Sequence, residues 1–444
     1  CHKTYIGKKN KKGQREIKLF AKSKDINSIG FFYSSITEFL GFKALRHEGK
    51  ITGLAAYGTK KYENVVSPVI LSHDGFTFKN NLIDNYENTS RLFLIFKFAT
   101  QNIKFFWKNL LNNSALELRY YQYKLTNFIS KNFKNESKEN IAKYAQCTLE
   151  NKVNDLVLNT LKVQNSDNIC LSGGVFANVK LNQTIYEKTK KNIFIMPGMD
   201  DGGLSIGAAL HVYEEKSGLQ AKENFDDIYF GPKYADDEIL SQLKKFNFKF
   251  EKIDNIEKKI ASYLHEGFII GRFNGSMEWG PRALGNRSIL AAPVDKKINN
   301  KLNDRLNRTE FMPFAPIILK EKFSEYFNDY DTELKCIKFM TMTLDVKEEK
   351  IKSIPAVVHI DNTARPQLVT KETNKSLYNI LNEYEKFSKI PVLVNTSFNL
   401  HEEPIVCSPY DALRAFEKGA VDYLALENFW ISNWYINNLE NLTN

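Results

Sequence analysis

The sequence predicts an α/β protein built from two domains, and two observations lead to that prediction. The chain of 444 residues is longer than a single hydrophobic core usually organises. Short apolar runs alternate along it with longer segments in which apolar residues recur every three or four positions, which is the pattern of strands alternating with helices. A turn-rich stretch at residues 218–230 is the expected linker, and we place the two domains at residues 1–222 and 223–444.

The composition is that of a globular protein, with 43% hydrophobic residues and a formal net charge of +10. The lysines are spread along the whole chain, so the charge indicates small anionic substrates such as phosphates rather than a nucleic-acid partner. The five cysteines are odd in number and include no C-x-x-C pair, so neither a zinc ribbon nor a disulfide framework is predicted, and a cytoplasmic location is expected. Residues 91–111 are the most apolar long stretch, but three lysines interrupt them, and no membrane span is predicted.

The first domain is expected to begin with a polar stretch, residues 1–27, in which no element is predicted. Apolar residues at helical spacing then predict a helix that ends before Gly41. Small residues at 48–58 predict a turn into a close-packed segment. Residues 65–80 predict a β-hairpin that turns at an Asp-Gly pair, and residues 140–163 predict a helix with one buried face.

A strand, a glycine turn and a helix are predicted next, at residues 167–171, Gly173-Gly174 and 175–190. The two glycines let the backbone approach a phosphate at the start of the helix, where N–H groups lack partners. The same order repeats in a strand at residues 192–196 and a helix at 204–215, with Asp201 between them. An aspartate in that place commonly caps the helix, but at the end of a strand it can also hold a hard cation near phosphates.

The stretch from 271 to 318 organises the second domain. An apolar run at residues 267–273 predicts a strand, and a second run at 289–294 predicts another. The loop between them holds two arginines, an amide, a hydroxyl and a carboxylate among three glycines, a set that predicts an anion site made of guanidinium groups and backbone N–H groups. A surface turn with solvated arginines is the alternative. The residues concerned are Glu278, Arg282, Asn286, Arg287 and Ser288.

Helices are predicted around this loop at residues 235–245, 256–267 and 296–307, and strands at 248–253 and 355–365. Arg308 follows the last of these helices, where it either extends the anion site or pairs with the helix carbonyls. The strand at 355–365 is expected to end in a polar turn that holds His359, Asp361 and Arg365.

Near the end of the chain, residues 391–394 predict a strand and residues 395–399 its polar exit. Asn395, Ser397 and Asn399 supply neutral donors and acceptors that suit an amide group, although such residues also satisfy the backbone of their own turn. Ser408 then begins a helix with proline at its first position.

Five segments together resemble a known family, the NodU/CmcH-type O-carbamoyltransferases. They read EGKITGLAAYG, SGGVFANVKLN, PGMDDGGLSIGAAL, GPRALGNRSILA with RTEFMPFAP, and NTSFN followed by EPIVCSPYDALRAF. The resemblance implies an actin/sugar-kinase-like (ASKHA-type) carbamoyltransferase domain followed by a YrdC-like α/β domain. It also implies ATP-dependent transfer of the carbamoyl group of carbamoyl phosphate, through carbamoyl-adenylate, to a hydroxyl of a glycan or natural product.

The resemblance further implies roles for particular residues. The family also uses a metal with an H-x-x-x-H histidine pair; no two histidines here have that spacing, so we expect the first domain to be incomplete at its N-terminus. The implied cofactors are ATP and Mg²⁺ or a transition metal such as Fe²⁺. The implied sites are catalytic (Arg282, Arg287, Ser288, Asn286), carbamoyl-binding (Glu278, Arg308, Asn395, Ser397, Asn399, Arg365), nucleotide-binding (Gly173, Gly174, Asn178) and metal-binding (Asp201).

Two other functions stay open at this point. One is a related carbamoyl-handling enzyme of tRNA modification or hydrogenase maturation, although the zinc-finger cysteines of the maturation proteins are missing. The other is a basic nucleic-acid-binding protein that retains an inactive carbamoyltransferase fold. The sequence does not decide the hydroxyl acceptor or the oligomeric state, a homodimer included.

Overall fold

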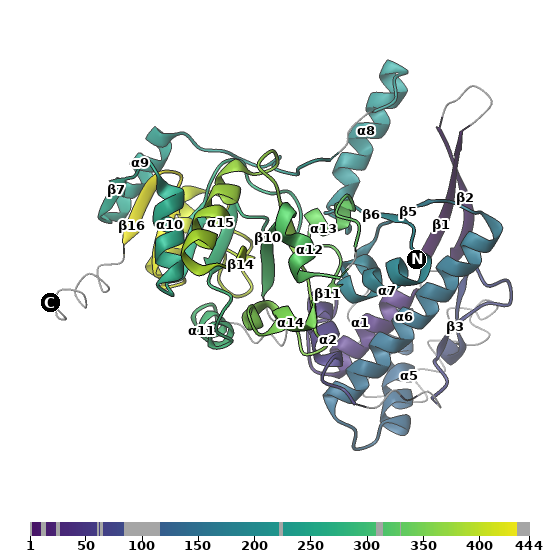
Figure 1. Ribbon diagram of the computed structural model, residues 1–444. Helices are drawn as coiled ribbons and strands as arrows, with labels where there is room; N and C mark the ends of the chain where they lie inside the picture. Colours follow the sequence, from purple (N-terminus) through teal and green to yellow (C-terminus); the bar gives the residue numbers. More distant parts are fainter. Residues whose placement is uncertain are drawn as a thin grey trace. The chain divides into compact units, whose positions relative to one another are not determined.

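The computed structural model describes residues 2–9, 15–23, 27–59, 62, 65–83, 116–221, 225–307, 314–328 and 330–432. The chain divides into two compact units (Figure 1). The first comprises Cys1–Asp167 and Thr184–Lys191, and the second comprises Asn168–Gln183 and Asn192–Asn444. The second unit therefore contains the predicted glycine turn, Asp201 and the arginine loop, while the domain boundary at residue 222 stays a prediction.

The first unit is mainly helical, and capping residues mark the ends of its first helix. Ser28 caps the helix α1 by accepting the N–H of Gly30, and Gly41 follows the helix with a φ of 91°. The predicted hairpin is confirmed as β3 paired antiparallel with β4. The elements are β1 (His2–Lys9), β2 (Arg15–Ser23), α1 (Ile29–Phe39), α2 (Glu48–Ala55), β3 (Val69–Leu71), β4 (Phe78–Asn80), a 3₁₀ turn (Asn81–Ile83), α5 (Leu116–Asn132) and α6 (Lys138–Val163).

The second unit contains a short parallel pair of strands and a large mixed sheet. The parallel pair is β5 (Asn168–Leu171) with β6 (Asn192–Ile195), each followed by a turn and a helix as predicted. A 3₁₀ turn (Gly174–Ala177) and α7 (Val179–Thr189) follow β5, and α8 (Gly203–Ser217) follows β6. The predicted single helix over residues 175–190 is therefore divided in two.

The large sheet has eight strands in the order β13-β10-β14-β9-β8-β15-β16-β7. β10 pairs with β13 and β8 with β15 in parallel, and the other neighbours are antiparallel, which confirms the α/β class with a mixed sheet. The strands are β7 (Phe250–Lys252), β8 (Ile270–Phe273), β9 (Arg287–Ala291), β10 (Ala315–Leu319), β13 (Gln367–Val369), β14 (Val392–Ser397), β15 (Tyr423–Leu426) and β16 (Phe429–Ser432).

Longer helices flank this sheet, and shorter elements connect its strands. The helices are α9 (Asp236–Phe246), α10 (Ile256–His265), α11 (Lys297–Arg305), α15 (Lys375–Ser388) and α16 (Pro409–Glu417). The shorter elements are α12 (Phe323–Tyr326), α13 (Lys335–Lys338), α14 (Glu348–Ile351), β11 (Leu344–Asp345), β12 (Thr363–Ala364) and 3₁₀ turns at Lys320–Lys322 and Pro355–Val357. Among the described residues, no helix combines the length and apolar character that crossing a membrane requires.

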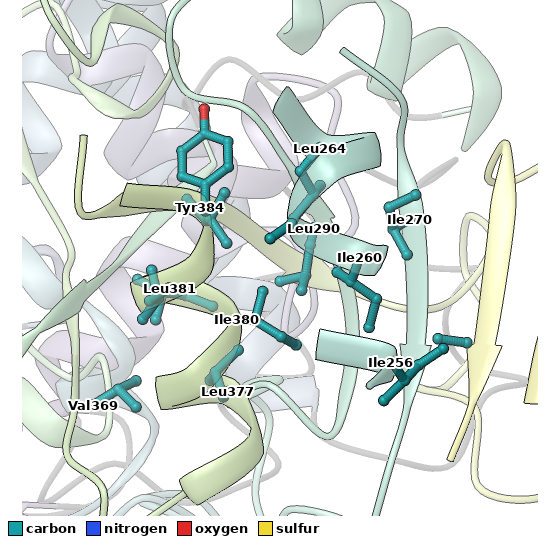
Figure 2. Close-up of a cluster of buried hydrophobic side chains, with 14 of the residues drawn as sticks. Ile256, Ile260, Leu264, Ile270, Leu290, Val369, Leu377, Ile380, Leu381 and Tyr384 are labelled. Atoms are coloured by element: carbon teal, nitrogen blue, oxygen red, sulfur yellow. The ribbon is translucent and has the colours of Figure 1, made fainter. Parts of the chain in front are cut away.

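The core of the second unit lies where α10 and α15 pack together on the sheet (Figure 2). Along β8, Ile270 faces this cluster, whereas the next residue, Gly271, lies against Phe398 instead. This alternation is what a strand between two packed layers requires. The labelled residues of the cluster are Ile256, Ile260, Leu264, Ile270, Leu290, Val369, Leu377, Ile380, Leu381 and Tyr384.

Several sequence-based predictions of local structure were wrong. Residues 2–9 and 15–23 form an antiparallel pair, although no element was predicted there. Residues 48–55 form the helix α2 rather than a turn. The strand predicted at 355–365 is a 3₁₀ turn and a loop that precede β12, and Asn395 to Ser397 lie within β14 rather than beyond it. Residues 91–111 lie outside the described part of the chain.

Candidate functional site

The loop between β8 and β9 is held in shape from inside by Glu278. This carboxylate is 4% exposed, and its Oε1 accepts the backbone N–H groups of Leu284 at 2.7 Å, Asn286 at 2.7 Å and Arg287 at 3.1 Å. Three donors that converge on one charged oxygen fix the course of the chain. Its charge acts on the pKa values of Arg287, Arg272 and Tyr229, so Glu278 belongs to the buried scaffold of the loop.

Arg287 is fully buried and contacts carbonyl groups of the protein. Its Nη1 donates to the carbonyls of Asn274 and Asn286, both at 3.0 Å, and its Nη2 donates to that of Pro232 at 3.0 Å. The guanidinium also lies 3.6 Å from the ring centroid of Phe273. Burial lowers the pKa of Arg287 to about 10, and nearby carboxylates offset part of that effect. Arg287 therefore stabilises the loop by donating hydrogen bonds to its carbonyl groups.

Asn286 and Ser288 are likewise engaged within the protein. The Oδ1 of Asn286 accepts from Arg272 at 3.0 Å and from Asn374 at 2.9 Å, and its Nδ2 donates to the carbonyl of Ser276 at 2.8 Å. The Oγ of Ser288 accepts the N–H of Gly285 at 2.9 Å.

Sequence analysis did not single out Arg272, which is 1% exposed. The available signal was a lone arginine within an apolar strand, since such a charge must find polar partners in the interior. It finds them in Asn286, Asn274 and the carbonyl of Gly285.

Arg282 and Arg365 differ from these arginines because, among the residues that the structure describes, no carbonyl or carboxylate accepts a hydrogen bond from either guanidinium group. The Nε of each is buried and has no hydrogen-bond partner within the described part of the chain. Burial lowers the pKa of Arg282, and burial together with the positive charge of Arg282 lowers the pKa of Arg365 well below its ordinary value. The positive charges of the two guanidinium groups repel each other, and an anion between them would relieve that repulsion.

Asn395 bonds to the residue after Arg282 and to the strand that follows Arg365. Its Nδ2 donates to the carbonyl of Ala283 at 2.9 Å and to the Oε1 of Gln367 at 3.1 Å. The Nε2 of Gln367 in turn donates to the carbonyl of Leu284 at 2.8 Å. Asn395 thus connects the residue after Arg282 to β13, which begins two residues after Arg365.

The remaining predicted carbamoyl-binding residues are placed differently. Asn399 donates through Nδ2 to the carbonyls of Leu400 and Glu403, both at 2.9 Å, and so stabilises the turn after β14. Ser397 is paired with Ser288 across β14 and β9. Arg308 lies outside the described residues.

The predicted nucleotide turn has the expected backbone form. Gly173 has a φ of 109°, which favours glycine, and a Cβ added at Gly173 or Gly174 would meet nothing within 4 Å. The side-chain Oδ1 of Asn178 accepts the N–H of Leu181 at 3.0 Å and so caps the start of α7. The turn leaves open space over both glycines, as a phosphate-binding turn requires.

Asp201 is exposed at the start of α8, and it is Asp200 that accepts the N–H of Gly202, at 3.0 Å. Within the described ranges, no three His, Cys, Asp or Glu side chains lie together as metal ligands. Hard cations require several oxygen ligands. Asp201 therefore supplies at most one ligand, and these residues alone do not make a metal site.

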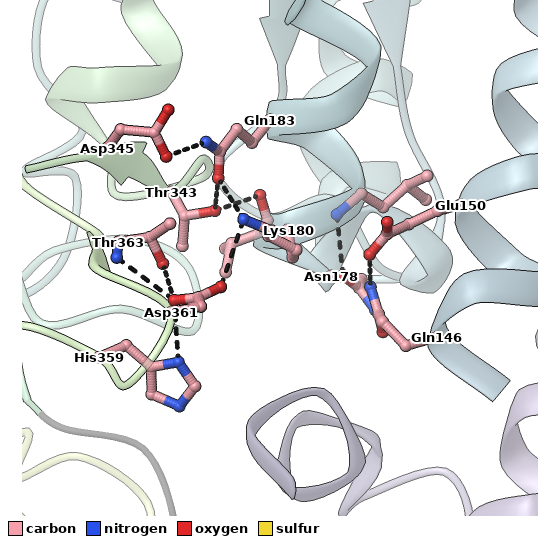
Figure 3. A network of polar contacts seen from close by, with 12 residues as sticks. Gln146, Glu150, Asn178, Lys180, Gln183, Thr343, Asp345, His359, Asp361 and Thr363 are labelled. Carbon is pink, nitrogen blue, oxygen red and sulfur yellow. Dashed lines mark hydrogen bonds and ion pairs between the residues drawn. The ribbon is translucent and has the colours of Figure 1, made fainter. Parts of the chain in front are cut away.

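A polar network connects α7 to the segment that leads into Arg365 (Figure 3). Lys180 pairs with Asp361 at 3.3 Å, and the same carboxylate accepts from the hydroxyl of Thr363 at 2.7 Å and contacts the Nδ1 of His359 at 3.1 Å. Burial alone would raise the pKa of Asp361, but His359, Lys180 and Thr363 together lower it well below its ordinary value. Asp361 is thus a fixed anion that holds the turn before Arg365.

Family models and individual relatives both match this chain along most of its length. The family models "Carbamoyltransferase N-terminus" and "Carbamoyltransferase C-terminus" match residues 2–210 and 261–433. The uncharacterized protein MJ1051 of Methanocaldococcus jannaschii is 36% identical over 94% of this chain and 75% of its own length. Nodulation protein NolO of Bradyrhizobium diazoefficiens is 34% identical over 64% of this chain and 53% of its own length.

Among solved structures, one of full-length HypF in a phosphate- and nucleotide-bound form is similar with a TM-score of 0.30 and 19% identity, over 42% of this chain and 22% of that chain. The chain spans only part of the length of each of these three proteins. The two family models nevertheless match it from residue 2 to residue 433 with one internal gap, and the chain belongs to the carbamoyltransferase family.

Proposed function

We propose that the chain takes part in ATP-dependent O-carbamoyl transfer, in which carbamoyl phosphate donates its carbamoyl group, through carbamoyl-adenylate, to a hydroxyl of a glycan or natural product. Membership of the carbamoyltransferase family supports the reaction class. The hydroxyl acceptor on a glycan or natural product is what the family resemblance implies, and relatives that are named nodulation proteins belong to the same set of matches.

The observation that carries this proposal is the pair Arg282 and Arg365, for which the described part of the chain supplies no anionic partner. Carbamoyl phosphate has a compact dianionic end, and a guanidinium binds two phosphate oxygens at once with charge-assisted hydrogen bonds. Burial is the main cause of the lowered pKa of Arg365 and the charge of Arg282 adds to it; a bound dianion would offset both effects. The two side chains would then hold the phosphate and stabilise the negative charge that it gains as it leaves.

The roles of the neighbouring residues follow from their contacts. Glu278, Asn286, Arg287 and Ser288 keep the loop in the form that presents Arg282. Asp361 and Lys180 hold the turn that precedes Arg365. We assign these residues to positioning rather than to direct contact with the substrate.

ATP is assigned to the open turn at Gly173 and Gly174, with Asn178 fixing the helix behind it. A bound Mg²⁺ would supply charge neutralisation at the ATP phosphates. Asp201 lies after the neighbouring strand β6 and would contribute one ligand to the metal that the transfer step uses. Formation of the adenylate consumes carbamoyl phosphate, ATP and one water and releases phosphate and pyrophosphate; transfer to the hydroxyl then releases AMP.

The test is carbamoyl-phosphate-dependent release of pyrophosphate from ATP by the 444-residue chain. Arg282→Ala is expected to lower this rate by about a hundredfold or more, because such cationic groups contribute on that scale. Arg414→Ala is the matched control, since Arg414 is already paired with Glu403. An unchanged rate in Arg282→Ala would remove the arginine pair from the reaction.

A further inference from the structure

The ring of Trp279, in the loop between β8 and β9, occupies the space in which a side chain of residue 198 would lie. A Cβ added at Gly198 would be 2.6 Å from Cη2 and 2.8 Å from Cζ2 of that ring, closer than real Cβ atoms approach. The φ of Gly198 lies outside the left-handed region, so the ring and not the backbone conformation requires glycine there. The next loop residue is close as well, since a Cβ at Gly280 would lie 3.3 Å from the carbonyl oxygen of Pro197. The arginine loop and the turn after β6 are therefore in direct contact.

The backbone of Trp279 is fixed on its other side by a neighbouring segment. Its N–H donates to the carbonyl of Ile228 at 2.8 Å. Two residues earlier, the N–H of Met277 donates to the carbonyl of Pro232 at 3.0 Å, and the carbonyl of Met277 accepts the N–H of Gly231 at 2.9 Å. These hydrogen bonds fix the part of the loop from which the ring projects.

The turn after β6 also contacts the glycine turn. The carbonyl of Met199 accepts the N–H of Gly173 at 2.6 Å and the hydroxyl of Ser172 at 3.4 Å. Met199 directly follows Gly198, so two consecutive residues hold the glycine turn and the ring of Trp279. Closely packed groups transmit displacement to one another, because the space between them does not allow either to move alone.

We propose that Trp279 is a positioning residue that couples the two ligand sites, so that ATP and carbamoyl phosphate each strengthen the binding of the other. This inference rests on the proposed function, which assigns ATP to the glycine turn and the phosphate of the donor to Arg282 and Arg365. A nucleotide that orders the glycine turn also fixes residues 198–199 and, through the ring, the loop segment that leads to Arg282, three positions further along.

The coupling has a stated direction and size. The ligand that binds second finds its site already ordered, and it therefore loses less conformational entropy on binding. The effect is reciprocal, since each ligand changes the affinity for the other by the same factor. Factors of about fivefold to a hundredfold in Kd are usual for two coupled sites.

Variants on both sides of the contact test it. Trp279→Ala removes the ring but keeps the N–H that binds Ile228, whereas Trp279→Phe retains a smaller ring and should retain part of the coupling. Gly198→Ala leaves the ring in the chain and adds a methyl group whose three nearest atoms, its chain neighbours aside, all belong to that ring. The methyl group should displace the ring. It should have no further effect in a chain that already carries Trp279→Ala, because residues in contact show such non-additivity.

Two control variants lie away from the contact. Trp430→Phe changes another tryptophan, which is 3% exposed and belongs to the core where α10 and α15 pack together, so it should lower stability and leave the coupling unchanged. Gly207→Ala adds a methyl group in α8, where nothing lies within 4 Å of it. These controls separate the coupling from a general loss of stability.

The experiment measures the Kd of α,β-methylene-ATP with Mg²⁺ for the full chain by calorimetry, with and without saturating inorganic phosphate at constant ionic strength. This analogue cannot form an adenylate, because carbon replaces the oxygen between its α and β phosphorus atoms, and inorganic phosphate stands for the phosphate end of the donor. In the wild type, phosphate should lower the Kd by about fivefold or more. Trp279→Ala should bring this factor close to one, Gly198→Ala should reduce it, and both control variants should keep it.

The outcomes distinguish the inference from the function on which it rests. A wild type that binds neither ligand contradicts the proposed function itself. A wild type that binds both ligands independently, or with mutual weakening, overturns only the coupling. Trp279→Ala with the wild-type factor overturns the role of the ring, as does Gly198→Ala with an unchanged factor. Because Gly198→Ala differs from the wild type by one methyl group, it decides the matter even where Trp279→Ala does not fold.

Discussion

Replacing Arg365 by methionine should have two effects of opposite sign. Methionine keeps the aliphatic stem of the side chain but removes a charge that no carboxylate compensates among the described residues and that Arg282 repels. An unpaired buried charge destabilises a protein by several kcal/mol, and because Arg365 is partly exposed we expect the variant to gain about 1 to 2 kcal/mol. For a chain of 444 residues its Tm should rise by roughly 1 to 2 °C. Its response to phosphate should fall.

The size of that second effect follows from linkage. At a phosphate concentration of about 100 Kd, the wild type gains about 2.7 kcal/mol of stability from binding. Losing one charge-assisted contact weakens binding by about tenfold to a hundredfold. At the same concentration the variant would then gain only about 1.4 to 0.4 kcal/mol.

The assay is thermal unfolding with and without inorganic phosphate, at constant ionic strength. Arg414→Met is the control, because its guanidinium pairs with Glu403 at 3.1 Å and its loss should lower stability slightly without changing the phosphate response. The reasoning is refuted if Arg365→Met is less stable than the wild type without ligand and is stabilised by phosphate to the same extent. That result would show that the charge is compensated and faces no anion site.

Three further predictions concern the loop, a glycine and the metal. Arg287→Ala leaves several carbonyls without their donor and should lower the free energy of unfolding by about 3 kcal/mol or more. Chemical denaturation measures this loss, and pyrophosphate release should be abolished. A variant as stable as the wild type would contradict the role of Arg287 in stabilising the loop. Gly285→Ala should lower the free energy of unfolding by about 2 kcal/mol, because φ is 106° and the new Cβ would lie within 3 Å of Leu377. Gly207→Ala is the control and should leave stability unchanged or raise it, since a Cβ there meets nothing within 4 Å. Equal melting temperatures of the two variants would contradict this prediction. Asp201→Asn should lower bound metal and carbamoyl transfer while adenylate formation continues; unchanged metal content in elemental analysis would limit Asp201 to the turn before α8.

Much of the second unit could be predicted because local chemistry decides it. The helix α16 begins at Ser408 with a reciprocal cap from Asp411, as its sequence indicated. The strands on either side of the arginine loop are fully buried and read as apolar runs. By contrast, β1 and β2 carry many charged and exposed residues, so no apolar pattern revealed them.

The sequence predicted which residue types form the site. It did not predict which of them support the loop and which are free to bind a substrate. Arg282 and Arg287 lie five positions apart in one loop and look equivalent in the sequence. Only tertiary packing shows that Arg287 is surrounded by carbonyls while Arg282 lies near Arg365, from a distant segment. The strand predicted at 355–365 was wrong because Asn362 adopts a φ of 62° and turns the chain there.

The most direct measurement of the central claim is a crystal structure of the chain with carbamoyl phosphate. The account predicts that the phosphate oxygens lie between the guanidinium groups of Arg282 and Arg365. A ligand bound elsewhere, with both guanidinium groups in contact only with protein or solvent, would contradict it.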